Sequence, residues 1–102
     1  MKTILIIDTG ETDTARVILE HLGKRHEMVS TSKVLRSQML LPLVESMLKE
    51  HTLIPSDVQG IQVATGPGSF TGLRVGIAIA NTLGYLLDIP VNGKKALVNP
   101  TY

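Results

Sequence analysis

The sequence predicts an α/β domain in which two helices pack on a mixed β-sheet. Three observations support this class. The chain has 102 residues, which is enough for one domain over residues 1–102. Three strand-like segments come before any helical pattern, and the second half then alternates helix, strand, helix and strand. The expected order is therefore β-β-β-α-β-α-β.

The first part of the chain predicts a three-stranded antiparallel meander. Residues 4–7 are a continuous apolar run, which is typical of a strand covered on both faces, and residues 8–10 form the turn after it. Residues 15–19 predict a second strand. Residues 25–31 predict a weaker third strand, which follows a turn at 23–24.

The middle of the chain predicts a helix followed by a strand. Residues 37–51 carry apolar side chains at helical spacing and charged side chains on the other side. Pro42 lies inside this segment, so either the regular helix begins near Leu41 or its first turns bend. Residues 61–65 predict a parallel strand, because a helix crossover connects it to the antiparallel ribbon.

A second helix is predicted over residues 72–87. It ends at 88–90, and Val91 then begins a short strand that soon meets Gly93. Apolar residues surround this helix almost completely, which is typical of a helix buried on every side.

Small residues recur at every fourth position of this second helix, at Gly72, Gly76, Ala80 and Gly84, so another backbone could approach closely. Since one small sheet cannot cover the whole helix, we interpret it as an intermolecular face. The alternative is that the first helix and the chain ends cover it within the monomer. The residues expected at the partner interface come from both helices: Leu40, Val44, Met47, Leu73, Gly76, Ile77, Ala80 and Gly84.

A glycine-rich loop at residues 65–72 connects the fourth strand to this helix. Its glycines permit close backbone approach, and the amides and hydroxyls at the start of the helix could either hold an anion or cap the helix. No lysine follows the loop, so it is not a P-loop. Both interpretations stay open, and the candidate contacts for an anion or nucleotide are Asp8, Thr9, Gly10, Gly66, Gly68, Ser69 and Thr71.

Composition and spacing argue against several kinds of chemistry. The net charge of +1 predicts no broad attraction to nucleic acid or membrane, and the lack of cysteine excludes thiolate sites. His21, His26 and His51 form no i, i+4 pair of the kind that holds a metal. Asp8 is the best lone carboxylate, either as a contact for Mg-nucleotide or as a turn anchor, but acid-base catalysis needs a second positioned group. We predict no catalytic residue, no metal and no cofactor on this chain alone.

Three segments resemble the TsaB (YeaZ) family, and the similarity extends over residues 2–92. They are 7–9, 37–42 and above all 66–76, which reads Gly-Pro-Gly-Ser-Phe-Thr-Gly-Leu-Arg-Val-Gly. The resemblance implies an actin/Hsp70-like (ASKHA) N-terminal domain, a cytoplasmic location and a part in tRNA threonylcarbamoyladenosine modification. It further implies that both helices pair with the catalytic relative TsaD, joined by the ATPase TsaE, or with a second copy. ATP and Mg would then bind only in the assembled complex, and tRNA would be contacted only indirectly.

The chain also departs from this family. The second actin-like domain of the family is not present in the 102 residues, Arg36 replaces a common histidine, and Lys94-Lys95 stand in a turn that is usually serine-rich. The metal-binding histidines of TsaD are missing from 92–99. Two other functions therefore stay open: the nucleotide-binding half of an actin-like ATPase or phosphotransferase, and a homodimeric structural module. The partner hypothesis predicts that a large residue at Gly76 or Ala80 prevents association while the domain stays folded.

Overall fold

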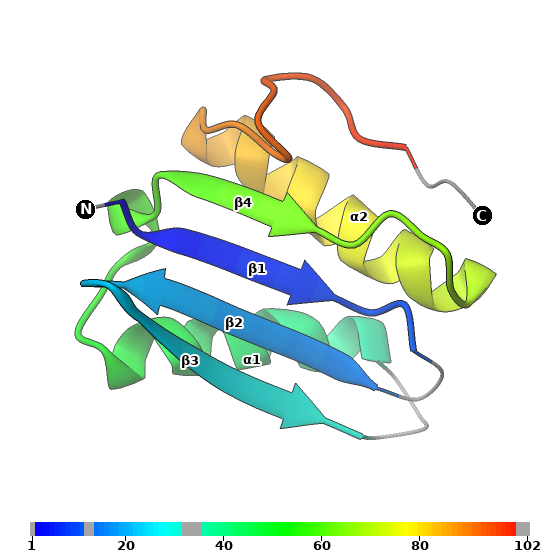
Figure 1. Ribbon diagram of the computed structural model, residues 1–102, viewed down its shortest axis with the longest axis horizontal. Coiled ribbons are helices and arrows are strands. Elements are labelled where there is room, and N and C mark those ends of the chain that lie inside the picture. The colour runs from blue at the N-terminus through cyan, green and yellow to red at the C-terminus, as the bar shows by residue number, and fades with distance from the viewer. Residues whose placement is uncertain (1, 12–13, 32–35, 100–102) are drawn as a thin grey trace.

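The structure, a computed structural model, describes residues 2–11, 14–31 and 36–99, apart from the side chains of 36–39 and 70. A four-stranded sheet and two α-helices form a two-layer α/β domain (Figure 1). This confirms the predicted fold class. Within the described residues, no helix has the length and apolar character needed to cross a membrane.

The sheet has the strand order β3-β2-β1-β4. Its strands are β1 (Ile4–Asp8), β2 (Ala15–His21), β3 (Lys24–Ser30) and β4 (Gly60–Val63). The first three pair antiparallel, and the strand after the helix is parallel, as the sequence predicts; its partner is β1. Residues 22–23 connect β2 to β3 with φ values of 53° and 75°, the left-handed backbone that suits a two-residue hairpin turn.

Both helices cover the same face of the sheet (Figure 1). Helix α1 (Arg36–Glu50) packs on β2 and β3, and α2 (Phe70–Leu87) packs on β1 and β4. A short 3₁₀ turn, η1 (Pro55–Asp57), precedes β4. Alternate strand residues point toward the helices, so the core lies between the two layers. Its strand-borne members are Leu5, Ile7, Ala15, Val17, Leu19, Ile61 and Val63.

The other face of the sheet is only half-buried. Ile4, Ile6 and Ile18 lie on it, surrounded by ion pairs between side chains on and beside neighbouring strands. These pairs are Arg16 with Glu11 at 3.2 Å, Arg16 with Glu27 at 3.6 Å, and Arg25 with Glu20 at 3.3 Å. The apolar run at residues 4–7 therefore has one buried side, whereas the sequence predicts a strand covered on both faces.

Pro42 lies inside α1, which begins at Arg36. A helix that starts near Leu41, the first of the two predicted possibilities, is therefore wrong. Pro42 is exposed, so its ring lies on the solvent side of the helix and not against the sheet.

The predicted fifth strand is reduced to a single bridge between Val91 and Ile61. The reason is a tight turn at Asn92 and Gly93, which have φ values of 51° and 82° and bring Lys94 back to pair with Val91. An Asn-Gly pair with left-handed backbone is a strong hairpin signal, and it reverses the chain before a strand can form.

One ring contact joins the end of α1 to the edge strand. The rings of His26 on β3 and His51 after α1 have centroids 4.0 Å apart, and both side chains are half-buried. We expect His51→Ala to lower the free energy of unfolding by about 1 kcal/mol, because an aromatic contact and its buried area are lost. Urea unfolding in mildly alkaline buffer measures this loss. A double-mutant cycle with His26→Ala should give a coupling energy of about 0.5 kcal/mol or more, and strictly additive losses would contradict the contact.

Candidate functional site

The turn after β1 and the glycine loop before α2 lie in direct contact. The strand-end turn is residues 8–10, and the glycine loop is residues 66–69. The amide of Ser69 donates to the carbonyl of Gly10 at 2.8 Å. A Cβ atom on Gly68 would lie 2.7 Å from that same carbonyl oxygen. Only glycine therefore fits at position 68, because the two backbones touch there.

The glycine loop ends in a helix cap. The hydroxyl of Ser69 accepts a hydrogen bond from the Gly72 amide at 3.3 Å, and its carbonyl accepts one from the Leu73 amide at 2.9 Å. These are the interactions of an N-cap serine. The amides of Ser69 and Gly72 are thus already used inside the protein. Of the two interpretations of this loop, the geometry favours the structural cap over the anion cradle.

Thr9 connects the strand-end turn to the first turns of α2. Its side chain is 1% exposed. Its hydroxyl donates to the carbonyl of Gly72 and accepts from the amide of Gly76 at 3.0 Å. A Cβ atom on Gly76 would lie 2.5 Å from this hydroxyl, so the helix can approach β1 closely only with glycine at this position.

Asp8 anchors the strand-end turn. Its carboxylate accepts the Gly10 amide at 2.9 Å, which is the usual role of an Asx turn. Asp8 also borders a shallow hollow of about 600 Å³ on the open face of the sheet, together with Gln62 and Asn92. The structure thus brings Thr9, Gly10, Gly68 and Ser69 together and joins Asp8 to them through Gly10.

Gly66 and Thr71 lie at the margins of this group. Gly66 is half-buried with φ of 138°, and it precedes Pro67 through a cis peptide bond. Thr71 is exposed on the first turn of α2. Neither residue adds a polar group to the contact between turn and loop described above.

The three histidines do not meet at one place. The ring of His21 forms a hydrogen bond of 2.9 Å with the Thr3 hydroxyl, whereas the rings of His26 and His51 contact each other at a tilt of 40°. In the described part of the chain, no three side chains of histidine, aspartate or glutamate lie close enough to share a metal ion.

The eight residues predicted at the partner interface are buried in this chain. Leu40, Met47, Leu73 and Ala80 are 0% exposed, and the others are also in the interior. They form the faces of α1 and α2 that pack on the sheet. The prediction that these residues present a surface to a partner is therefore wrong, and the alternative of cover within the monomer holds for them. The full set is Leu40, Val44, Met47, Leu73, Gly76, Ile77, Ala80 and Gly84.

A different apolar stripe reaches the surface. On α2, the half-buried side chains of Val75, Ile79 and Leu83 are four positions apart, and Leu86, three positions further on the same side, is 69% exposed. On α1, Leu43 is half-buried and Leu41 is 43% exposed. Leu41 and Leu43 are two positions apart and therefore lie on different sides of α1. We call the set on α2 the helix stripe: Val75, Ile79, Leu83 and Leu86.

The opposite flank of α2 is occupied by residues 92–99. In Figure 1 this segment lies beside α2 on the side away from α1. The side-chain NH₂ group of Asn81 donates to the Val98 carbonyl at 3.0 Å, and its side-chain oxygen accepts from the Val98 amide at 2.9 Å. The helix stripe must therefore face the α1 side of α2, because Asn81 lies on the other flank.

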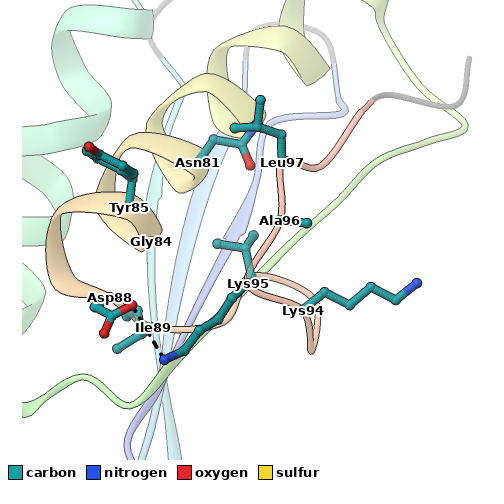
Figure 2. A pocket seen from close by; sticks show the side chains of 10 residues that line it. Asn81, Gly84, Tyr85, Asp88, Ile89, Lys94, Lys95, Ala96 and Leu97 are labelled. Carbon is teal, nitrogen blue, oxygen red and sulfur yellow. Dashed lines mark ion pairs between the residues drawn. The ribbon is translucent and has the colours of Figure 1, made fainter.

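A second cavity of about 490 Å³ lies between the end of α2 and residues 94–97 (Figure 2). Tyr85 and Leu97 line it and are 84% and 76% exposed. An exposed ion pair of 3.4 Å joins Asp88 to Lys95 at its border. No pattern in the sequence marks this cavity or the side-chain contacts of Asn81 and Asn92. Asn92 holds the backbone of Val63 with its side-chain amide, in the same way as Asn81 holds Val98.

The fold and this site define a class: an actin-like α/β domain whose glycine loop closes onto the strand-end turn and caps a buried helix. The family model described as TsaD: tRNA N6-adenosine threonylcarbamoyltransferase matches residues 31–97, more than half of the chain. The chain belongs to this family.

Its relatives include proteins named TsaB. The chain is 37% identical over 95 residues to the tRNA threonylcarbamoyladenosine biosynthesis protein TsaB of Bacillus subtilis, which covers 93% of this chain and 42% of that protein. It is 33% identical to TsaB of Escherichia coli, over 93% of this chain and 41% of the relative. The structure of YeaZ from Pseudomonas aeruginosa matches with a TM-score of 0.84 at 35% identity, over 89% of this chain and 42% of that one. The predicted resemblance to TsaB (YeaZ) is confirmed, and the chain spans less than half the length of these relatives.

Proposed function

We propose that this chain is a non-catalytic partner subunit in tRNA threonylcarbamoyladenosine modification. In this role it pairs with a TsaD-type catalytic subunit, with a TsaE-type ATPase joining the assembly, or with a second copy of itself. The proposal places it in the cytoplasm and gives it contact with tRNA only through the complex. The names of its TsaB relatives support the pathway.

The helix stripe is the observation that carries this proposal. Val75, Ile79 and Leu83 are half-buried against the core yet still reach the surface, and Leu86 extends the stripe into solvent. Apolar side chains held rigidly by the core lose little conformational entropy when a partner covers them. The centre of a stable interface is typically apolar with few charges, as this stripe is.

The surface that we propose for pairing is thus the helix stripe and not the small-residue positions of α2. A partner role of the two helices is still proposed. The small residues of α2 bring the helix close to its own sheet, and the larger apolar residues on the flank facing α1 remain for a partner. The expected interface is therefore the outer side of the α1–α2 pair. Its centre is Val75, Ile79 and Leu83 of α2.

A nucleotide-binding role has one supporting feature. The hollow beside Asp8 lies where the carboxyl ends of β1 and β4 meet, which is the usual place for ligands in α/β sheets. The amides of Ser69 and Gly72, however, are already bonded within the protein. We therefore favour the partner role, with ATP and Mg bound in the assembled complex.

The test is a charged substitution in the middle of the helix stripe. Ile79→Asp should weaken association with a TsaD-type protein or with a second copy at least about tenfold, because a carboxylate would be desolvated against an apolar partner. Isothermal titration calorimetry measures the first affinity, and analytical ultracentrifugation measures self-association. Circular dichroism confirms that the variant is folded.

Ala78→Asp is the matched control. It adds the same charge one position earlier on the same helix, at an exposed residue that is turned about 100° away from Ile79. It should retain wild-type affinity. Equal loss in both variants would point to a general charge effect, and unchanged affinity in Ile79→Asp would refute the stripe as the pairing surface.

A further inference from the structure

Thr9 makes an unusual pair of contacts with α2. Its hydroxyl donates to the Gly72 carbonyl and accepts from the Gly76 amide. These two backbone groups stand four residues apart, as do the donor and acceptor of a single α-helical hydrogen bond. A side chain of the strand-end turn thus lies on the hydrogen-bond ladder of the helix.

Few side chains could make this contact. A hydroxyl can donate and accept at the same time, whereas an aliphatic side chain of the same shape can do neither. The space is also restricted, because a Cβ atom on Gly76 would lie 2.5 Å from the Thr9 hydroxyl and 3.3 Å from the Cγ2 atom of Ile7. Thr9 therefore recognises one particular turn of α2.

The helix is held at a second point by the glycine loop. There the Ser69 amide bonds Gly10, and the Ser69 hydroxyl caps the helix. The loop fixes where α2 begins. Thr9 contacts the helix one turn later and fixes how α2 is rotated and placed along β1.

The rotation of α2 decides which side chains reach the surface. One residue of slip turns the helix by about 100°, which would carry Val75 and Ile79 away from the α1 side. We infer that Thr9 is the positioning residue of α2 and, through its hydroxyl, of the helix stripe. The second part of this inference rests on the proposed function, and the first part does not.

The test compares Thr9→Val, which keeps the shape of the side chain, with Thr9→Ser, which keeps the hydroxyl. In Thr9→Val the ratio of the exchange rates of the Gly76 and Gly84 amides should rise at least about tenfold, because the hydrogen bond from the Gly76 amide to the Thr9 hydroxyl is lost. Thr9→Ser should restore the wild-type ratio. Amide exchange is followed by NMR, and urea unfolding records global stability separately.

The same variants are then tested for association. Thr9→Val should weaken binding to the TsaD-type protein, or to a second copy, about tenfold, and Thr9→Ser should restore it. Thr9→Cys, which keeps a weak donor and acceptor, replaces Thr9→Val if that variant does not fold, and it should give an intermediate exchange ratio. Asn81→Ala, which frees Val98 on the other flank, should leave the Gly76 exchange ratio unchanged.

An unchanged exchange ratio in Thr9→Val, or failure of Thr9→Ser to restore it, would overturn the positioning role. A changed ratio with unchanged association would overturn the link to the helix stripe. If the wild-type chain binds neither probe, the proposed function fails, while the exchange ratios still decide whether Thr9 positions α2.

Discussion

Gly76→Ala is expected to lower the free energy of unfolding by about 3 kcal/mol, although alanine is the better helix former. The new Cβ atom would lie 2.5 Å from the Thr9 hydroxyl and 3.3 Å from Ile7. Either α2 moves off β1, or Thr9 loses its bonds to Gly72 and Gly76 inside the core. Overpacking and unsatisfied buried groups each cost about 1–3 kcal/mol. Urea unfolding followed by circular dichroism measures the change.

Ala78→Gly is the control for helix propensity. Residue 78 is exposed on the same helix, so the loss there should be only about 1 kcal/mol, the usual difference between alanine and glycine. Without a packing conflict, Gly76→Ala would stabilise the chain by the same amount. A variant that is as stable as the wild type would show that the helix does not approach β1 this closely.

This result also separates the two interpretations of the small-residue stripe. An intermolecular face predicts a folded Gly76 variant that has lost its partner. Burial against the sheet predicts a destabilised monomer. Larger residues at Ala80, which is 0% exposed, should lower the free energy of unfolding even more. The structure supports the second outcome.

The fold was largely predictable because its signals are local. Apolar runs, the turn near residue 23 and the helical spacing of residues 37–51 each reflect short-range preferences, and the strands and helices follow that order. The missing fifth strand was also a local matter. Asn92-Gly93 is a recognised hairpin signal, and its turn directly follows Val91, where the strand was expected to begin.

The site was less predictable because it depends on contacts between distant residues. A pattern of glycines at every fourth position shows that some backbone comes close, but it does not say which one. The answer is Thr9, sixty-seven residues before Gly76. Periodicity likewise cannot show which flank of an apolar helix its own sheet covers, and this is why the predicted interface residues proved to be core.

Polar side chains that replace backbone partners are also hidden from sequence. Asn81 and Asn92 each satisfy the amide and the carbonyl of one residue elsewhere in the chain. The sequence neighbours of such an asparagine do not differ from those of an asparagine exposed to water. Only the completed fold shows that these residues hold the segment after α2 in place.

Gly68→Ala is the second substitution with a large expected effect, a loss of about 2–3 kcal/mol in the free energy of unfolding. Its Cβ atom would lie 2.7 Å from the Gly10 carbonyl oxygen and 3.1 Å from the Gly10 Cα atom. Both are backbone atoms, so neither can rotate away as a side chain does. The glycine loop must separate from the strand-end turn, which breaks the bond from the Ser69 amide to Gly10.

Gly93→Ala distinguishes this steric cost from the general cost of replacing a loop glycine. Gly93 has φ of 82° and nothing within 4 Å of a Cβ atom, so alanine there meets only the strain of a left-handed backbone, about 1 kcal/mol. Gly68→Ala should therefore lose about twice as much in the same urea experiment. Equal losses in the two variants would mean that Gly68 is required only for its backbone conformation and not for the close contact with Gly10. The interpretation of residues 66–69 as a turn closed onto Gly10 would then be wrong.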